Sequence, residues 1–272
     1  MDDLGYIAAM PDIANTPVIA VEQLAVRRSG RAVLTQVSFA ISSGESVAIV
    51  GPNGAGKTTL MLAMMGLLPL ESGRVLLDGR DLRHFTNRKA IARRIAYVPQ
   101  QYDGFAGFTV HDMVAAGRYA HQGPFALHTA EDRRIVGESM AAAGLDDMRD
   151  RIVSQLSAGE RQKVLLAAAM AQQSPILFLD EPTTALDPRH QVELAALLRR
   201  LHASGYTLVI ICHDLNLAIA LDSRILALRD SKLLYDEAIG EFTTEQHLSQ
   251  TYSTEFERLP SLTGHIRVAP LL

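Results

Sequence analysis

The stretch Gly51-Pro52-Asn53-Gly54-Ala55-Gly56-Lys57-Thr58 decides the fold of this chain. It follows the apolar run Val47–Val50 and precedes Thr59–Met65, so it joins a predicted strand to a predicted helix. The spacing matches the pattern G-x-x-x-x-G-K-[ST] of a phosphate-binding loop. A glycine-rich turn without a ligand is the alternative, but every position of the pattern is filled. The stretch therefore predicts a nucleoside triphosphate site.

The residue types in this loop suit phosphate chemistry. Glycines let backbone N–H groups approach phosphate oxygens, and the following helix directs its unpaired N–H groups and positive dipole end at the same anion. We expect Lys57 to contact the outer phosphates and Thr58 to offer its hydroxyl to Mg²⁺. The predicted phosphate contacts are Gly51, Pro52, Asn53, Gly54, Ala55, Gly56, Lys57, Thr58 and Thr59.

Composition narrows the class of protein. The chain has 272 residues, 48% hydrophobic and 21% charged, as expected for an ordinary globular protein. Its net charge of −4 argues against binding nucleic acid through a basic face. No apolar run approaches the ~18 residues of a membrane-spanning helix, and Met1-Asp2-Asp3 lacks the basic start of a secretory signal. The single Cys212 follows an apolar run, so we expect a buried thiol in a reducing, cytosolic compartment.

The order of periodic segments predicts an α/β fold. Strand-like and helix-like runs alternate before residue 100 and after residue 175, which favours a mostly parallel sheet. Residues 101–174 lack strand-like runs, so we expect an inserted helical subdomain there, with Thr129 and Asp132 starting one helix. We expect residues 1–17 to be a loose tail, 18–256 the main domain and 257–272 an irregular tail.

A pair of carboxylates follows another apolar run. Ile176–Leu179 reads as a buried strand, and Asp180 and Glu181 emerge at its carboxyl end, where open α/β sheets bind ligands. A solvated acidic turn is the alternative. Beside a phosphate-binding loop, however, Asp180 is expected to hold Mg²⁺ and Glu181 to polarise the attacking water.

The stretch Leu156-Ser157-Ala158-Gly159-Glu160-Arg161-Gln162 separates classes of such proteins. Ser157 and Glu160 have the S-x-x-E spacing of a helix capping box, and a helix N-terminus with a serine also suits phosphate. The segment resembles the LSGGQ signature of ABC-type ATPases, with Ala158 and Glu160 as departures. The added methyl of Ala158 and the charge of Glu160 put close phosphate approach in question, unless the capping box absorbs that charge.

Three further motifs of that family occur in the right order. They are a Q-loop ending in Gln100, an Asp-loop ending in Asp187, and a switch histidine, His213, which alone would read as a core histidine. The resemblance covers about Val18 to Glu257. It implies an ATP-hydrolysing α/β domain with a mostly parallel core sheet, an antiparallel β subdomain and an inserted helical subdomain.

The resemblance also implies how these residues act. Two copies would pair head to tail around two ATP molecules, so that Ser157, Ala158, Gly159 and Glu160 of one copy face the γ-phosphate held by Lys57 of the other. The implied catalytic residues are Glu181, Gln100 and His213. The implied Mg²⁺ ligands are Thr58, Gln100 and Asp180, and Asp187 would lie at the dimer contact.

The family usually stacks adenine on an aromatic residue near the end of the first strand. The corresponding position here is Arg28, and no aromatic residue is near it in the sequence. Because a guanidinium plane can stack on a base, we expect Arg28 to contact adenine, with weak base selectivity.

Several segments favour one class within the family. Gly117–Tyr119, Leu186–Gln191, His213–Ala218 and Thr244–Tyr252 resemble ATPases that drive import of iron(III)-siderophores, haem or vitamin B12, most of all the iron(III)-hydroxamate ATPases. The resemblance implies a separate membrane permease and, indirectly, a periplasmic or lipid-anchored binding protein. It places the chain at the cytoplasmic face of the bacterial inner membrane.

The permease's coupling helix would meet residues Gln101–Tyr119. The apolar candidates for that contact are Tyr102, Phe105, Phe108 and Met113, although ordinary subdomain core is equally compatible with them. A rival function is that of an ABC-type scaffold ATPase that moves nothing across a membrane. Long heptad repeats and a tandem second cassette are absent from the sequence, which disfavours DNA-repair and translation ATPases.

Overall fold

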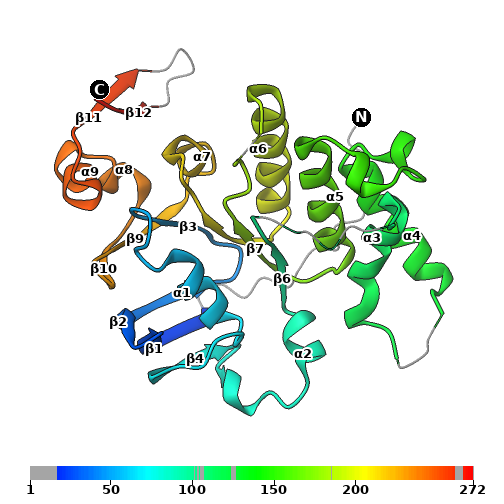
Figure 1. Cartoon of the computed structure of the whole chain (residues 1–272), viewed down its shortest axis with the longest axis horizontal. Coiled ribbons are helices and arrows are strands. Elements are labelled where there is room, and N and C mark those ends of the chain that lie inside the picture. The colour runs from blue at the N-terminus through cyan, green and yellow to red at the C-terminus, as the bar shows by residue number, and fades with distance from the viewer. Residues whose placement is uncertain are drawn as a thin grey trace. The chain divides into compact units, whose positions relative to one another are not determined.

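The computed structural model describes residues 17–100, 102, 104, 107–123, 127–184, 186–260 and 266–271. Its contacts divide the chain into two units, one holding Asn87–Tyr206 and the other holding Asp12–Thr86 with Thr207–Leu272. Figure 1 labels the elements of both. The phosphate-binding loop and His213 belong to the second unit. The two carboxylates and the signature segment belong to the first.

The second unit begins with an antiparallel sheet in the order β2-β1-β4-β5. Its strands are β1 (Pro17–Arg28), β2 (Arg31–Ser42), β4 (Ser72–Leu77) and β5 (Arg80–Asp81), followed by the 3₁₀ turn η1 (Leu82–His84). Ser29 and Gly30 join β1 to β2 with φ of 48° and 78°. A two-residue loop with both φ positive matches the right-handed twist of a hairpin. This sheet confirms the antiparallel β part of the expected fold.

The same unit carries a second sheet in the order β10-β9-β3-β8. Its strands are β3 (Ser46–Val50), β8 (Thr207–Ile211), β9 (Arg224–Arg229) and β10 (Lys232–Glu237). β3 runs parallel to both β8 and β9, and β10 is antiparallel to β9. Every residue of β3 and β8 is buried, which explains why both read as continuous apolar runs. Cys212, at the end of β8, is buried as expected.

Helices and a C-terminal hairpin complete this unit. They are α1 (Lys57–Met64), α7 (Leu215–Ala220), α8 (Ile239–Phe242), α9 (Glu245–Tyr252), β11 (Phe256–Pro260) and β12 (Ile266–Pro270). α1 packs against β1 and β2, as Figure 1 shows. The expected irregular tail is wrong, because β11 and β12 pair antiparallel. Pro260 and Pro270 are the last residues of their strands, where proline is tolerated, and Val268 exchanges hydrogen bonds with the side chain of Asn216.

The first unit pairs β6 (Ile95–Val98) in parallel with β7 (Ile176–Asp180). Its other elements are α2 (Arg88–Ala92), α3 (Val110–Ala116), η2 (Gly117–Ala120), α4 (Ala130–Ala142), η3 (Asp146–Met148), η4 (Val153–Gln155), α5 (Ala158–Ala171) and α6 (Pro188–Ala203). α3, α4 and α5 pack on one another, and Figure 1 shows them in green. The helices expected between residues 101 and 174 are thus present in the described part of that stretch.

Local sequence accounts for the ends of these helices. Thr129 caps α4, and its side chain and that of Asp132 exchange hydrogen bonds with each other's backbone N–H. Leu194, Leu197, Leu198 and Leu201 form the buried face of α6 at the spacing of an amphipathic helix. In the part of the chain that the structure describes, no helix has the length and apolarity needed to cross a membrane.

Candidate functional site

The phosphate-binding loop joins β3 to α1, as the sequence predicts. Gly56 caps α1 without a side-chain hydrogen bond, and the first turn contains no acidic residue. The first-turn N–H groups of a helix have no intrahelical partner, and the first turn of α1 itself carries no carboxylate that could accept their hydrogen bonds. The helix start therefore suits a phosphate group.

Two glycines of the loop have steric reasons to be glycine. Gly51 has φ of 140°, and a Cβ built there would lie 2.1 Å from the carbonyl oxygen of Leu228 in β9. Gly56 has φ of 100°, and its Cβ would lie 2.9 Å from Leu34 Cδ2. The loop is thus pressed against its own unit, which fixes the path of its backbone.

Lys57 is 7% exposed. Its Nζ donates hydrogen bonds to the carbonyl oxygens of Gly51, at 2.9 Å, and of Pro52, at 3.2 Å. The ammonium group is therefore held over the loop by the backbone that would surround a phosphate. Thr58 is exposed on the same turn, while Thr59 is buried.

His213 emerges at the same edge of this sheet. β3 and β8 are parallel with Ile49 opposite Ile211, and the Cys212 N–H donates to the Ile49 carbonyl at 3.2 Å. Because parallel strands present their carboxyl ends at one edge, the loop after β3 and His213 after β8 share that edge. His213 itself is exposed, so the structure agrees with a surface role rather than a core histidine.

In the other unit, the structure brings Gln100 and Glu181 together. The Gln100 side chain donates to Glu181 Oε2 at 2.6 Å, and the hydroxyl of Thr184 donates to the same oxygen at 3.2 Å. Glu181 has φ of 48°. Such a backbone conformation is uncommon for a non-glycine residue and is often found at functional sites.

Asp180 ends β7 and is 3% exposed. The hydroxyl of Tyr97 in β6 donates to Asp180 Oδ2 at 3.4 Å. Burial, and then the Asp180 carboxylate, raise the pKa of Tyr97 to about 12, so the phenol stays protonated and remains a donor. Tyr97 stands in the Q-loop, three residues before Gln100, but the sequence alone suggested no role for it.

The signature segment forms the capping box that its spacing predicts. The Ser157 N–H donates to Glu160 Oε2 at 2.7 Å, and the Glu160 N–H donates to the Ser157 hydroxyl at 3.3 Å. Hydrogen bonds to the carboxylate from the Ser157 N–H and then from the Ser157 side chain, with Arg151 nearby, lower the pKa of Glu160. The charge of Glu160 is thus taken up locally, as anticipated. Ala158 is half-buried in the first turn of α5.

Asp187 caps α6, and its neighbour Ala185 lies outside the described residues. Asp187 Oδ1 accepts the His190 N–H at 2.9 Å, and Oδ2 lies 2.8 Å from His190 Nδ1. These contacts, first the backbone one, lower the pKa of Asp187. From the sequence, His190 was named only within the segment Leu186–Gln191 and was given no role of its own. Arg28, the proposed base contact, is exposed at the end of β1.

A family model and several known proteins match this chain. The model of the ABC transporter family matches residues 34–184, over half of the chain. The chain belongs to the ABC transporter family. The ferric enterobactin transport ATP-binding protein of Escherichia coli is 38% identical to this ABC ATPase over 232 residues, 85% of each chain. The iron(3+)-hydroxamate import ATP-binding protein of Bacillus subtilis is 34% identical over 240 residues, 88% of this chain and 89% of the relative.

Among solved structures, a bacterial ABC transporter cassette determined as a dimer is 28% identical, with a TM-score of 0.73 over 81% of this chain and 98% of that one. This ABC ATPase binds ATP and couples its hydrolysis to transport, as the family does. Proteins of the family dimerise, and in importers they pair with membrane permease subunits.

Proposed function

We propose that this ABC ATPase drives the import of iron(III)-siderophore complexes from the cytoplasmic face of the bacterial inner membrane. The observation that carries the proposal is the similarity to two importer subunits, named for ferric enterobactin and iron(3+)-hydroxamate, over at least 85% of both chains. Because those two relatives are named for different cargoes, the similarity supports iron(III)-siderophore complexes as a class and not one particular complex. Hydroxamate complexes are the member to test first.

For ATP binding, we propose that the loop Gly51–Thr59 surrounds the phosphates. Two features support this role. The buried ammonium of Lys57 supplies positive charge, and the start of α1, which no side chain caps, supplies backbone N–H groups at the same place. Arg28 is proposed to stack on the base, which its exposed position permits.

The proposed Mg²⁺ ligands are Thr58, Gln100 and Asp180. All of them offer oxygen atoms, the donors that Mg²⁺ prefers. Among the described residues, no three His, Cys, Asp or Glu side chains gather as a metal cage, which suits an ion bound by few protein groups together with phosphate oxygens. The ion would neutralise negative charge on the phosphates.

For hydrolysis, Glu181 is proposed to accept the proton of the attacking water. Gln100 orients this carboxylate through the 2.6 Å hydrogen bond, so the oxygen does not have to reorganise when water arrives. His213 is proposed to donate to the γ-phosphate, and its exposed place at the loop's edge of the sheet supports that role.

We propose that two copies pair head to tail. Ser157, Ala158, Gly159 and Glu160 of one copy would then face the γ-phosphate bound by the other, and Asp187 would lie at the contact between copies. The support is the N-terminus of α5, where Ser157 is exposed, Ala158 and Glu160 are half-buried and Gly159 is buried at the start of a helix.

The proposed permease contact lies in the helical subdomain, taken as about residues 101–174 of an ATPase domain spanning 18–256. Tyr102 and Phe108 are 42% and 47% exposed, and Met113 is half-buried. Phe105 lies outside the described residues. Exposed aromatic side chains are enriched at protein contacts. Phe108→Asp with Met113→Asp should prevent assembly with the permease, whereas Leu127→Asp, at another exposed apolar position of this unit, should not.

The experiment that tests the function measures ATP hydrolysis by the complex of this chain with its permease, with and without a ligand-loaded periplasmic or lipid-anchored binding protein. We expect stimulation by an iron(III)-hydroxamate complex, lost in Glu181→Gln. Stimulation by haem or cobalamin alone would contradict the siderophore assignment. A permease that never co-purifies, with hydrolysis indifferent to every ligand, would favour a scaffold ATPase.

A further inference from the structure

Gly159, in the first turn of α5, lies directly against the ring of His190 in α6. A Cβ at Gly159 would be 2.7 Å from His190 Cγ, 2.9 Å from Cδ2 and 3.0 Å from Nδ1. Gly159 is within the regular part of α5, so its backbone does not call for glycine. The ring of His190 occupies the space that any side chain at residue 159 would need.

The same ring also contacts Asp187. Nδ1 lies 2.8 Å from Asp187 Oδ2, and Oδ1 of the same carboxylate accepts the His190 backbone N–H. A carboxylate only accepts hydrogen bonds, so the ring presents Nδ1 as N–H. One imidazole thus contacts both the first turn of α5 and the residue that caps α6.

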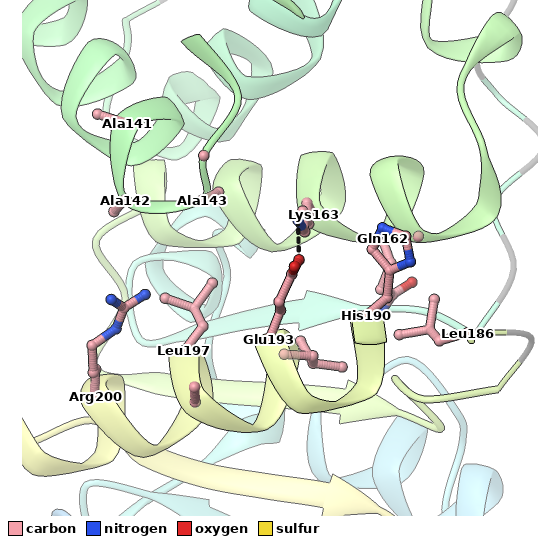
Figure 2. A pocket seen from close by; sticks show the side chains of 14 residues that line it. Ala141, Ala142, Ala143, Gln162, Lys163, Leu186, His190, Glu193, Leu197 and Arg200 are labelled. Atoms are coloured by element: carbon pink, nitrogen blue, oxygen red, sulfur yellow. Dashed lines mark hydrogen bonds and ion pairs between the residues drawn. The ribbon is translucent and has the colours of Figure 1, made fainter. Parts of the chain in front are cut away.

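A second contact, one turn further along, keeps the two helices in register. Lys163 Nζ lies 2.5 Å from Glu193 Oε2, and Figure 2 shows this pair beside His190 and Gln162. Gly159 and Lys163 are four residues apart, and His190 and Glu193 three apart, so each pair lies on one helix face. Two successive turns of α5 are therefore joined to two successive positions of α6.

A cavity of about 360 Å³ runs along the contact between the two helices. Its lining includes Gly159, Lys163, His190 and Glu193, and also Ala141, Ala142, Ala143, Leu197 and Arg200, most of which Figure 2 labels. The Gly159–His190 and Lys163–Glu193 contacts therefore border this cavity, and the first of them lies at the N-terminal turns that carry Ser157 and Asp187.

We propose that His190 is a positioning residue that fixes the signature turn of α5 relative to Asp187. The proposal rests on the function proposed above, in which Ser157 and Gly159 face the partner's nucleotide and Asp187 faces the partner subunit. A dimer that closes on ATP must present both elements at once. By filling the space between them, His190 sets their separation before the partner arrives, which lowers the ordering cost of closure.

The test is a double-mutant cycle in the full-length Glu181→Gln chain, which should accumulate the ATP-bound dimer. The single variants are Gly159→Ala and His190→Ala, and the readout is the ATP-dependent dimer dissociation constant measured by sedimentation. We expect each single variant to weaken the dimer about tenfold. In the double variant the methyl group at residue 159 meets no ring, so the two losses should fall short of additive by roughly 5–20-fold, within the range of contacting residues.

Two controls separate positioning from folding. His190→Asn keeps a planar donor at the place of Nδ1 and should restore most of the dimer affinity. Val192→Ala trims a side chain of the same helix that is 70% exposed, and it should leave the dimer unchanged. Melting temperatures of all variants show whether the dimer is lost through unfolding.

The outcomes distinguish the two proposals. If the parent Glu181→Gln chain forms no dimer with ATP, the head-to-tail function is wrong and this inference falls with it. If the parent dimerises while the His190→Ala chain dimerises equally well, or its loss is additive with that of Gly159→Ala, only the positioning role of His190 is refuted. A lowered melting temperature with unchanged dimer affinity would likewise show that His190 serves folding alone.

Discussion

The side-chain amide of Gln100 donates a 2.6 Å hydrogen bond to Oε2 of Glu181. The two residues follow β6 and β7, whose parallel register places Val98 opposite Leu179. Strand pairing thus places the neutral amide of Gln100 beside the carboxylate of Glu181. The backbone of Glu181 has φ of 48°. Residues of its own unit therefore orient the Glu181 carboxylate.

Glu181→Gln should abolish turnover while sparing nucleotide binding. The amide keeps the size of the carboxylate but cannot accept a proton from water, so the hydrolysis rate should fall roughly 10²–10⁴-fold. Steady-state phosphate release and equilibrium ATP binding would measure the two effects separately. Thr184→Val, which removes only the weaker 3.2 Å donor, serves as the control and should cost far less. Turnover retained in Glu181→Gln would remove Glu181 from catalysis.

The three loop glycines should tolerate alanine very unequally. At Gly51 the new methyl group would overlap the Leu228 carbonyl at 2.1 Å, at Gly56 it would press on Leu34 at 2.9 Å, and at Gly54 nothing lies within 4 Å. Gly54→Ala then costs only the strain of a positive φ, about 1–2 kcal/mol. Gly56→Ala adds overpacking of about 1–3 kcal/mol, and Gly51→Ala should cost more still. Urea unfolding of the three variants gives the order directly, and equal losses at Gly51 and Gly54 would contradict this account.

Arg28→Ala tests the missing aromatic residue. Arg28 is exposed at the end of β1, so its removal should leave folding intact. If its guanidinium stacks on adenine, ATP affinity should fall roughly 5–100-fold, the value of one stacked base. Titration with ATP and GTP measures both affinity and base selectivity. The adjacent Arg31→Ala, in the facing strand, provides a matched loss of charge. Unchanged ATP affinity with equal turnover of GTP would rule out stacking by Arg28.

Most of the elements around the candidate site could be predicted from local sequence patterns. The β3–loop–α1 unit, the capping boxes at Thr129 and Ser157, and the strand leading to Asp180 all follow from residues within a few positions of one another. Helix α9 also had a local signal, Thr244 as its N-cap with Glu245 in the first turn, which the sequence analysis did not use.

Contacts between distant segments could not be predicted in the same way. The fit of His190 against Gly159 depends on how α5 and α6 pack, and nothing in either segment alone encodes that distance. The strand β12 is also held from another element, because the side chain of Asn216 exchanges hydrogen bonds with the backbone of Val268. The proline content of that segment pointed away from strands, because composition does not reveal that each proline ends its strand.

The buried ion pair of Arg118 and Asp132 should be important for folding. Their side chains are 6% and 8% exposed, and Arg118 Nε lies 2.8 Å from Asp132 Oδ1. Arg118 also donates to the Ala171 carbonyl and to Gln173, which joins η2 to α4 and to the end of α5. Replacing Asp132 with Asn would leave the arginine charge buried without its counter-ion, at a cost of about 3–5 kcal/mol at neutral pH.

The pH dependence of that cost identifies its electrostatic origin. The hydrogen bond from Arg118, and then the Thr129 N–H, lower the pKa of Asp132 from 3.8 to about 2 in the folded protein. A carboxyl whose folded pKa is lowered stabilises the protein above its unfolded pKa, and this contribution is lost as pH falls through the folded pKa. The difference in unfolding free energy between the natural chain and Asp132→Asn should therefore be constant above about pH 5 and shrink between pH 4 and pH 2. Other acids, such as Asp81 with its similarly lowered pKa, are common to both chains and cancel in the difference. A difference that stays constant down to pH 2, measured by urea unfolding, would show that packing rather than charge makes Asp132 important.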